Sequence, residues 1–185
     1  VKLLLDAGAD PNKQDNDGYT ALISAVYKND IEFIKLLVNA GTDLNKQNNN
    51  GDTALNRAAY YNNVEIVKLL LNAGANINKQ NNEGDTALIL AAHVNNITII
   101  KLLLDNGADI DKQNVSGNTA LIRASENDNI GIVKLLLNSG ADIDKQNKYG
   151  YTALTLAALY NYHEIVELLL DYGADEFILD NNDKS

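Results

Sequence analysis

The sequence contains no cysteine, methionine or tryptophan and only one proline among its 185 residues. Without cysteine, the chain has no disulfide framework, no thiolate metal site and no cysteine nucleophile, and it suits a reducing compartment. Basic residues are also scarce, since 15 Lys and Arg stand against 25 Asp and Glu and give a net charge of −10. Because Lys and Arg are the residues that hold phosphate backbones and anionic lipids, we expect neither nucleic acid nor membrane as the partner.

Long apolar runs are missing as well. No stretch approaches the roughly 20 apolar residues of a membrane span, and the N-terminus lacks a basic and then apolar signal sequence. We therefore expect a cytoplasmic protein. The abundance of Asn and Lys is typical of AT-rich genomes, such as those of intracellular bacteria or large viruses, and such an origin would place the protein in host cytoplasm. Because the first residue is Val and Met is absent, we interpret the chain as a piece of a larger protein.

What the sequence does contain is a strict internal repeat. The triplet Thr-Ala-Leu recurs every 33 residues, beginning at Thr20, Thr53, Thr86, Thr119 and Thr152. Similarity at a fixed period of this size is the signature of stacked repeats that bury a continuous core. We divide the chain into a single domain at 1–185 that holds a partial repeat at 1–14, full repeats at about 15–47, 48–80, 81–113, 114–146 and 147–179, and a tail at 180–185.

Each repeat predicts a short helix, a longer helix and a polar arm. The first helix begins at the Thr of the triplet, a good N-cap, and ends near Asn29 and its equivalents, where Asn tolerates a left-handed backbone. We expect the next polar residue, such as Asp30 or Asn63, to cap the second helix. That helix is apolar almost all round, so neighbouring repeats should cover both its sides. Residues 1–8 should be the second helix of the partial repeat.

The period of 33, the Gly-x-Thr-Ala-Leu sequence that opens the first helix and the Ile-Val-Lys-Leu-Leu-Leu-x-x-Gly-Ala sequence that closes the second resemble the ankyrin repeat over residues 1 to about 179. The resemblance implies an all-α solenoid of stacked helix-turn-helix units with protruding β-turn arms. It also implies a protein–protein interaction module that binds a partner protein on its concave face and is not an enzyme.

Two departures from the family pattern bear on rigidity. The family usually has Thr-Pro-Leu-His, whereas Ala stands here in place of Pro, and the His position is occupied by Ile23, Asn56, Ile89, Ile122 and Thr155. Loss of this hydrogen-bonding residue predicts a less rigid stack. The fourth full repeat is the weakest by sequence, because Gly131 lies within its second helix and Ser125 replaces a small apolar residue.

We find no constellation of residues that carries chemistry. His93 and His163 lie 70 residues apart and form no metal-ligand cluster, so we predict no metal and no cofactor. Paired carboxylates, such as Asp109 with Asp111, recur as part of the arm, and a turn-stabilising role is the better interpretation. The turn at 15–18 resembles a calcium loop, but Lys13 occupies a position that needs an oxygen ligand and Ser24 occupies one that needs Glu.

The resemblance also places the candidate binding surface, at the arm tips (positions 16, 17 and 19) and the exposed end of the first helix (27 and 28). These five positions of the five full repeats hold seven of the nine tyrosines, a residue enriched in interfaces. Two or three of these rings would instead pack against the neighbouring helix. The predicted partner-binding residues are Tyr19, Tyr27, Asp52, Tyr60, Tyr61, Glu83, Asp85, His93, Glu126, Tyr149, Tyr151 and Tyr160.

Between the flanking tyrosines, the acidic residues of this set would steer a basic segment of the partner, or they are ordinary solvated charges. We expect the chain to be a monomer. Two other functions stay open: a regulatory or substrate-positioning segment of a larger multidomain enzyme, and a structural spacer without a specific ligand. Catalytic motifs elsewhere in the full-length product would favour the first of these, whereas the placement of the tyrosines argues against the second.

Overall fold

The computed structural model describes residues 7–181, and within this span the chain forms ten α-helices and no β-strand. The expected helix at residues 1–8 falls almost entirely outside the described residues. Each full repeat contributes a first helix of seven residues and a second helix of nine. The helices are α2 (Ala21–Tyr27), α3 (Ile31–Asn39), α4 (Ala54–Tyr60), α5 (Val64–Asn72), α6 (Ala87–His93), α7 (Ile97–Asp105), α8 (Ala120–Glu126), α9 (Ile130–Asn138), α10 (Ala153–Leu159) and α11 (His163–Asp171).

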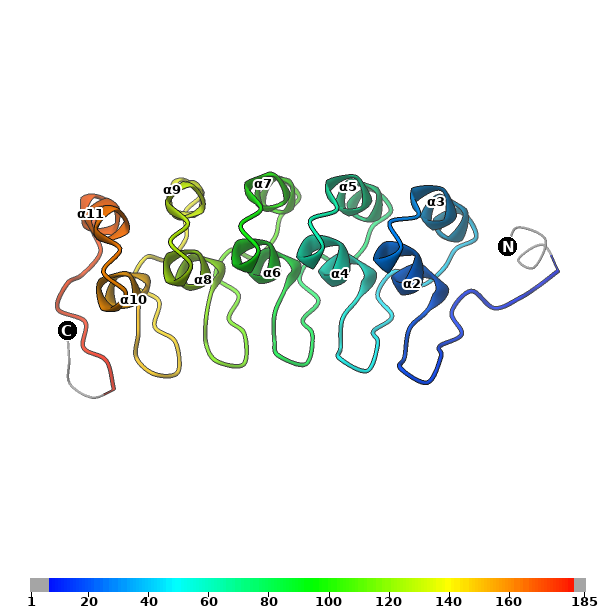
Figure 1. Cartoon of the computed structure of the whole chain (residues 1–185), viewed down its shortest axis with the longest axis horizontal. Helices are drawn as coiled ribbons and strands as arrows, with labels where there is room; N and C mark the ends of the chain where they lie inside the picture. Colours follow the sequence, from blue (N-terminus) through cyan, green and yellow to red (C-terminus); the bar gives the residue numbers. More distant parts are fainter. Residues whose placement is uncertain (1–6, 182–185) are drawn as a thin grey trace.

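The helices stack in two rows. Figure 1 shows the first helices, α2 to α10, side by side in one row and the second helices, α3 to α11, in a row above it. The arms project from the first-helix row on the side away from the second helices. Helices of seven or nine residues are marginal in isolation, so contacts between neighbouring repeats supply the stability that the short segments lack.

The termini of the first helices follow the expected pattern. In each full repeat the Thr of the triplet accepts a hydrogen bond at its side chain from the backbone N–H three residues on. The residues that follow each first helix take a left-handed conformation with φ between 54° and 63°, at Asn29, Asn62, Asn95, Asp128 and Asn161. The helix ends were therefore predicted from residue type alone.

The caps of the second helices were predicted less well. Asp30 accepts a hydrogen bond from the Phe33 backbone N–H at 3.0 Å, as expected, whereas Asn63 makes no side-chain capping bond. The backbone angles are close at the two positions, with φ and ψ of −90° and 83° at Asp30 and of −92° and 77° at Asn63. The difference is therefore one of side-chain rotation, and the expected cap at Asn63 is wrong.

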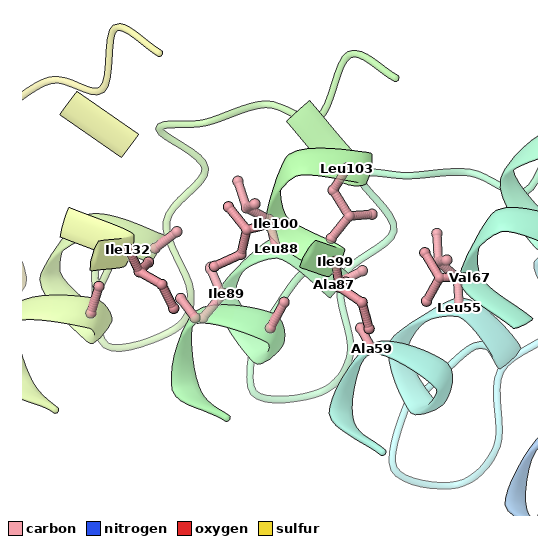
Figure 2. Packing of buried hydrophobic residues seen from close by; sticks show 14 of the residues in the cluster. Leu55, Ala59, Val67, Ala87, Leu88, Ile89, Ile99, Ile100, Leu103 and Ile132 are labelled. Atoms are coloured by element: carbon pink, nitrogen blue, oxygen red, sulfur yellow. The ribbon is translucent and has the colours of Figure 1, made fainter. Parts of the chain in front are cut away.

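Burial is concentrated in the first helices. In α6, the six residues from Ala87 to Ala92 are all buried, whereas α7 buries only Ile99, Ile100 and Leu103. Figure 2 labels six of these side chains, which lie in the buried cluster with residues of the neighbouring repeats: Ala87, Leu88, Ile89, Ile99, Ile100 and Leu103. The second helices are not covered all round, because they form the outer row. Leu36 and Leu170 remain 38% and 42% exposed, which corrects the expectation from their apolar sequence.

The arms are joined by a repeating hydrogen-bond ladder. The Gln80 side-chain amide donates to the backbone carbonyls of Gly84 in its own arm (2.6 Å) and Gln113 in the next arm (2.9 Å). The same two bonds recur at Gln14, Gln47, Gln113 and Gln146. A second row links the arms through the side-chain oxygens of Asn or Asp, because Asn45 Oδ1 accepts from the Asn76 backbone N–H at 2.7 Å and Asp111 Oδ1 accepts from the Asp142 backbone N–H at 2.9 Å. Within one arm, Asp109 Oδ1 accepts from the Asp111 backbone N–H at 3.3 Å, which confirms the turn-stabilising role predicted for the paired carboxylates.

The residues that replace the family's His divide into two kinds. Asn56 Oδ1 accepts from the Thr53 backbone N–H at 3.1 Å, and its Nδ2 reaches the carbonyls of Lys79 and Asp85 in the next arm at 3.3 and 3.4 Å. Thr155 likewise closes a capping box at the start of α10. By contrast, Ile23, Ile89 and Ile122 are each only 1% exposed. Three repeats thus replace the hydrogen bonds by apolar packing.

Candidate partner-binding surface

The structure divides the twelve predicted site residues by exposure. Asp52 is buried, at 6% exposed. Five residues are half-buried, namely Tyr19, Tyr61, Asp85, Glu126 and Tyr151. The exposed residues are Tyr27, Tyr60, Glu83, His93, Tyr149 and Tyr160. Tyr19 and Tyr151 pack against the core, as the sequence predicted for two or three of the rings.

Three tyrosines from two repeats form one aromatic cluster, which we call the tyrosine ledge: Tyr27, Tyr60 and Tyr61. The Tyr61 ring makes edge contacts with Tyr27 (centroids 5.7 Å apart) and Tyr60 (5.5 Å). Tyr27 and Tyr60 remain 65% and 43% exposed. Edge-to-face geometry is the arrangement that aromatic pairs prefer, so the rings are held in place while two of them face solvent.

Arg57 contacts two rings of the ledge. Its guanidinium carbon lies 4.7 Å from the centroid of the Tyr61 ring and 5.8 Å from that of Tyr60, within the range of cation–π attraction. The guanidinium also donates a hydrogen bond to the Tyr61 hydroxyl. Burial raises the pKa of Tyr61 above its ordinary value, and the charge of Arg57 offsets part of this effect. Tyr61 is therefore partly structural, and Tyr60 is the freer ring.

Asp52 is buried rather than exposed, contrary to the expectation from sequence. One carboxylate oxygen lies 3.3 Å from Arg57 Nη1, and the other accepts a hydrogen bond from Asn81 Nδ2 of the next arm at 3.0 Å. A short side chain at this arm position is close enough to bond to the next arm, so Asp52 turns inward. Its negative charge is matched by Arg57 within the stack.

A pocket of about 390 Å³, which we call the central pocket, lies beside Tyr60. Leu90, only 9% exposed, and Ile89 are its apolar residues, whereas Arg57 and Arg123 belong to the repeats on either side. The complete lining is Asp52, Arg57, Tyr60, Asn81, Glu83, Asp85, Ile89, Leu90, His93 and Arg123. The structure thus brings five predicted site residues, Asp52, Tyr60, Glu83, Asp85 and His93, around one hollow.

Asp85 is the half-buried carboxylate of the central pocket. Burial is the largest influence on it and raises its pKa above the ordinary value of 3.8. The hydrogen bond from Asn114 Nδ2 to Asp85 Oδ1 (2.8 Å) and the charge of Arg123 act in the opposite direction but do not outweigh burial. Loss of water around a carboxylate disfavours its charged form, so Asp85 is short of compensating positive charge.

The remaining tyrosines form separate groups in the last full repeat. Tyr149 and Tyr151 have ring centroids 6.4 Å apart, and Tyr160 pairs with Tyr162 at 5.8 Å. Between them and the ledge lie the third and fourth repeats, and in the fourth Glu126 is bound by Arg123 at 2.8 Å. The predicted surface is therefore two aromatic regions separated by a charged middle.

Sequence reasoning missed Arg57, Leu90, Arg123 and Tyr162. A signal was present for the arginines, because the chain contains only two and they occupy the same register position in the second and fourth repeats. Leu90 holds that position in the third repeat, so a shorter apolar side chain lies between two long cationic ones. This alternation creates the central pocket. Tyr162 carried no such signal, since the equivalent position in the other full repeats holds Asn or Asp.

Paired short helices and hydrogen-bonded arms define a solenoid of helix-turn-helix repeats. A family model described as ankyrin repeats (3 copies) matches residues 1–81, 73–147 and 113–180, and the chain belongs to this family. The comparison with curated proteins gave no match. Ankyrin repeats generally serve protein–protein interaction, and the family is typically non-enzymatic.

Across residues 7–181, His, Asp and Glu side chains form no group of three or more that could hold a metal ion. Over the same span, each helix is too short or too polar to cross a bilayer.

Proposed function

We propose that this chain is a protein-binding module whose partner docks on the arm tips and the exposed ends of the first helices, with the tyrosine ledge as a principal contact. The observation that carries the proposal is that seven of nine tyrosines fall at these register positions and that four of them, Tyr27, Tyr60, Tyr149 and Tyr160, are exposed. Tyrosine supplies rigid, amphipathic contact area at low entropic cost, and it is enriched among interface hot spots.

The ledge has the properties of a preformed contact. Tyr27 and Tyr60 expose much of their rings, while contacts with Tyr61 and Arg57 restrict their motion. Binding to such a surface costs less side-chain entropy than binding to a surface whose rings are free and must first be ordered. The same surface would serve for a separate protein or for another domain of the same polypeptide, and we propose no catalytic step. The monomeric state and the cytoplasmic location remain predictions.

The test is affinity capture with the wild-type chain and the Tyr60→Ala variant in parallel, followed by titration of the purified partner. Because interface tyrosines commonly contribute 2 kcal/mol or more, Tyr60→Ala should weaken binding by at least about tenfold. Urea unfolding should change by no more than about 0.5 kcal/mol, since this ring is the freer one.

Lys68→Ala is the matched control. Lys68 lies on α5 in the outer row, where its exposed side chain pairs with Glu65 at 3.1 Å. Its removal should alter neither affinity nor stability by much, because exposed ion pairs contribute little. If Tyr60→Ala unfolds the protein while affinity per folded molecule stays intact, Tyr60 is a packing residue and the proposed surface is wrong. Tyr61→Ala should lower both quantities, because that ring also holds Tyr27 and Arg57.

A further inference from the structure

The charges around the central pocket do not cancel. Arg57 is engaged by Asp52 (3.3 Å), and Arg123 is engaged by Glu126 (2.8 Å). Two carboxylates of the lining, Glu83 and Asp85, form no ion pair within 4.0 Å among residues 7–181. With both arginines matched, the pocket keeps an excess of negative charge, and this excess lies next to the tyrosine ledge.

The walls and base of the pocket suit an elongated side chain with a charged end. Leu90 and the Tyr60 ring offer apolar surface, whereas Asp85 and Glu83 lie on the arm of the same repeat. Lys and Arg bury their alkyl stems against apolar groups while the charged head seeks water or a carboxylate, and cations are also attracted to tyrosine faces. A carboxylate ligand would have to compete with Asp52 and Glu126 for the two arginines.

We propose that the central pocket receives a lysine or arginine side chain of the partner, with its cationic head at Asp85 and Glu83 and its stem along Tyr60 and Leu90. This inference rests on the proposed function and specifies its chemistry. The partner segment therefore presents a basic residue beside the residues that cover the ledge. The half-desolvated state of Asp85 supports the assignment, because an arriving cation would supply the charge that burial has left unmatched.

The next repeat shows which substitution removes the charge of Asp85 without disturbing its hydrogen bond. Asn118 occupies the register position of Asp85 in the next repeat, and its Oδ1 accepts the equivalent hydrogen bond from Asn147 Nδ2 at 2.9 Å. Asp85→Asn therefore keeps the bond from Asn114 while it removes the charge. Glu83 is exposed at the arm tip, so Glu83→Gln is also compatible with the fold. Neither substitution changes the volume of the pocket appreciably.

The experiment selects short random peptides from a display library on the wild-type chain and measures their dissociation constants. Enriched peptides should share a Lys or Arg, and Asp85→Asn should weaken their binding by about tenfold. Replacing that basic residue of the peptide by norleucine should cost a similar factor on the wild-type chain. The two changes together should cost little more than either alone, because they remove the same interaction. Lys68→Ala should leave binding unchanged.

The outcomes separate this inference from the function on which it rests. Selected peptides could depend on Tyr60 for binding and yet contain no basic residue that is coupled to Asp85. Such peptides would overturn the inference and leave the proposed function standing. Peptides with an acidic anchor that depends on Arg57 or Arg123 would overturn it in the same way. If the selection yields no peptide whose binding is weakened by Tyr60→Ala, the proposed function itself is contradicted.

Discussion

The arms and the exposed ends of the first helices obey one 33-residue register but differ in how strictly they repeat. In the arms, the same Gln makes the same two hydrogen bonds in every full or partial repeat from Gln14 to Gln146. At the end of the first helix, the equivalent position holds Tyr27, Tyr60, His93, Glu126 and Leu159. The backbone contacts that join the repeats need one residue type, whereas the solvent-facing position carries no such requirement and is free to serve recognition.

The arm ladder also has an edge. Phe177 and Leu179 occupy the register positions of Asp144 and Gln146, and they are 78% and 49% exposed. The last described arm still receives hydrogen bonds, because Gln146 Nε2 donates to the Leu179 carbonyl at 3.0 Å. Its own side chains, however, lack the amide and carboxylate groups that earlier arms use toward the next one. Arm positions that join two repeats therefore hold amide or carboxylate side chains, whereas Phe177 and Leu179 offer neither group.

The largest expected effect comes from arm packing, in a pair of glycine variants. Gly84 has φ of +76°, and a Cβ there would lie 2.5 Å from the Val115 backbone nitrogen of the next arm. Gly107 also has positive φ (+82°), but a Cβ would meet no atom within 4 Å. Gly84→Ala combines left-handed strain with overpacking and should lower the free energy of unfolding by about 3 kcal/mol. Gly107→Ala carries the strain alone and should cost about 1 kcal/mol.

Urea unfolding followed by circular dichroism measures both losses. Equal losses for Gly84→Ala and Gly107→Ala would contradict the idea that close approach of the arms, in addition to backbone conformation, requires glycine at the arm tip.

In the fourth repeat, two substitutions should raise the free energy of unfolding rather than lower it. Ser125 is 0% exposed and its Oγ has no hydrogen-bond partner among the described residues, whereas Ala59 and Ala92 fill the same register position. Gly131 lies within α9, where a Cβ would meet only Ile97 Cδ1 at 3.9 Å. Ser125→Ala and Gly131→Ala should each raise the free energy of unfolding by about 0.5 to 1 kcal/mol.

Hydrogen exchange provides the second readout for these variants. Amides of α8 and α9 should exchange faster than those of α6 and α7 in the wild-type chain, and the double variant should reduce the difference. Gly107→Ala is the control, because the same substitution at a left-handed position should destabilise the protein. A loss of stability at Gly131 would mean that the fourth repeat is not weakened by its glycine.

Sequence periodicity predicted the repeats, the helix ends and the family, because each depends on residue type at a fixed position. The left-handed residues such as Asn62, with φ of 63°, are an example. Side-chain partners were harder to predict, as Asp52 shows. The same arm position holds Tyr19 in the first full repeat and Asp52 in the second. The aspartate is short enough to accept a bond from Asn81. Asn48 stands in the same register relation to Tyr19, and its Nδ2 is buried without a partner in the described chain.

The register shows that Leu90 lies between Arg57 and Arg123, but the shape of the central pocket could not be predicted, for a related reason. It depends on the direction in which the two arginines extend along the lining, and each pairs with a different acid, Asp52 in one repeat and Glu126 in the other. Rotamer choice of this kind follows from local packing and charge, which the register does not record. The exposure of Tyr60 was predicted, but its place at the edge of a pocket was not.

The smallest expected effect concerns Asp85, which belongs to both regions because it bonds to Asn114 of the next arm and lines the central pocket. Burial raises its pKa above 3.8, with Arg123 and His93 lowering it and Glu83 raising it further. A folded-state pKa above the unfolded-state pKa means that the neutral carboxyl of Asp85 is the form that the fold favours. Its contribution to the free energy of unfolding is fully present below the unfolded-state pKa and is lost as pH rises through the folded-state pKa. Asp85→Asn keeps the bond to Asn114 and has no carboxyl group that ionises as pH rises. The stability of this variant relative to wild type should therefore increase as pH rises from below 3.8 through the folded-state pKa, and then level off, in urea unfolding over a pH series. An unchanging difference, or one that favours wild type more strongly at higher pH, would show that ionised Asp85 stabilises the stack and belongs with the arms rather than with the surface.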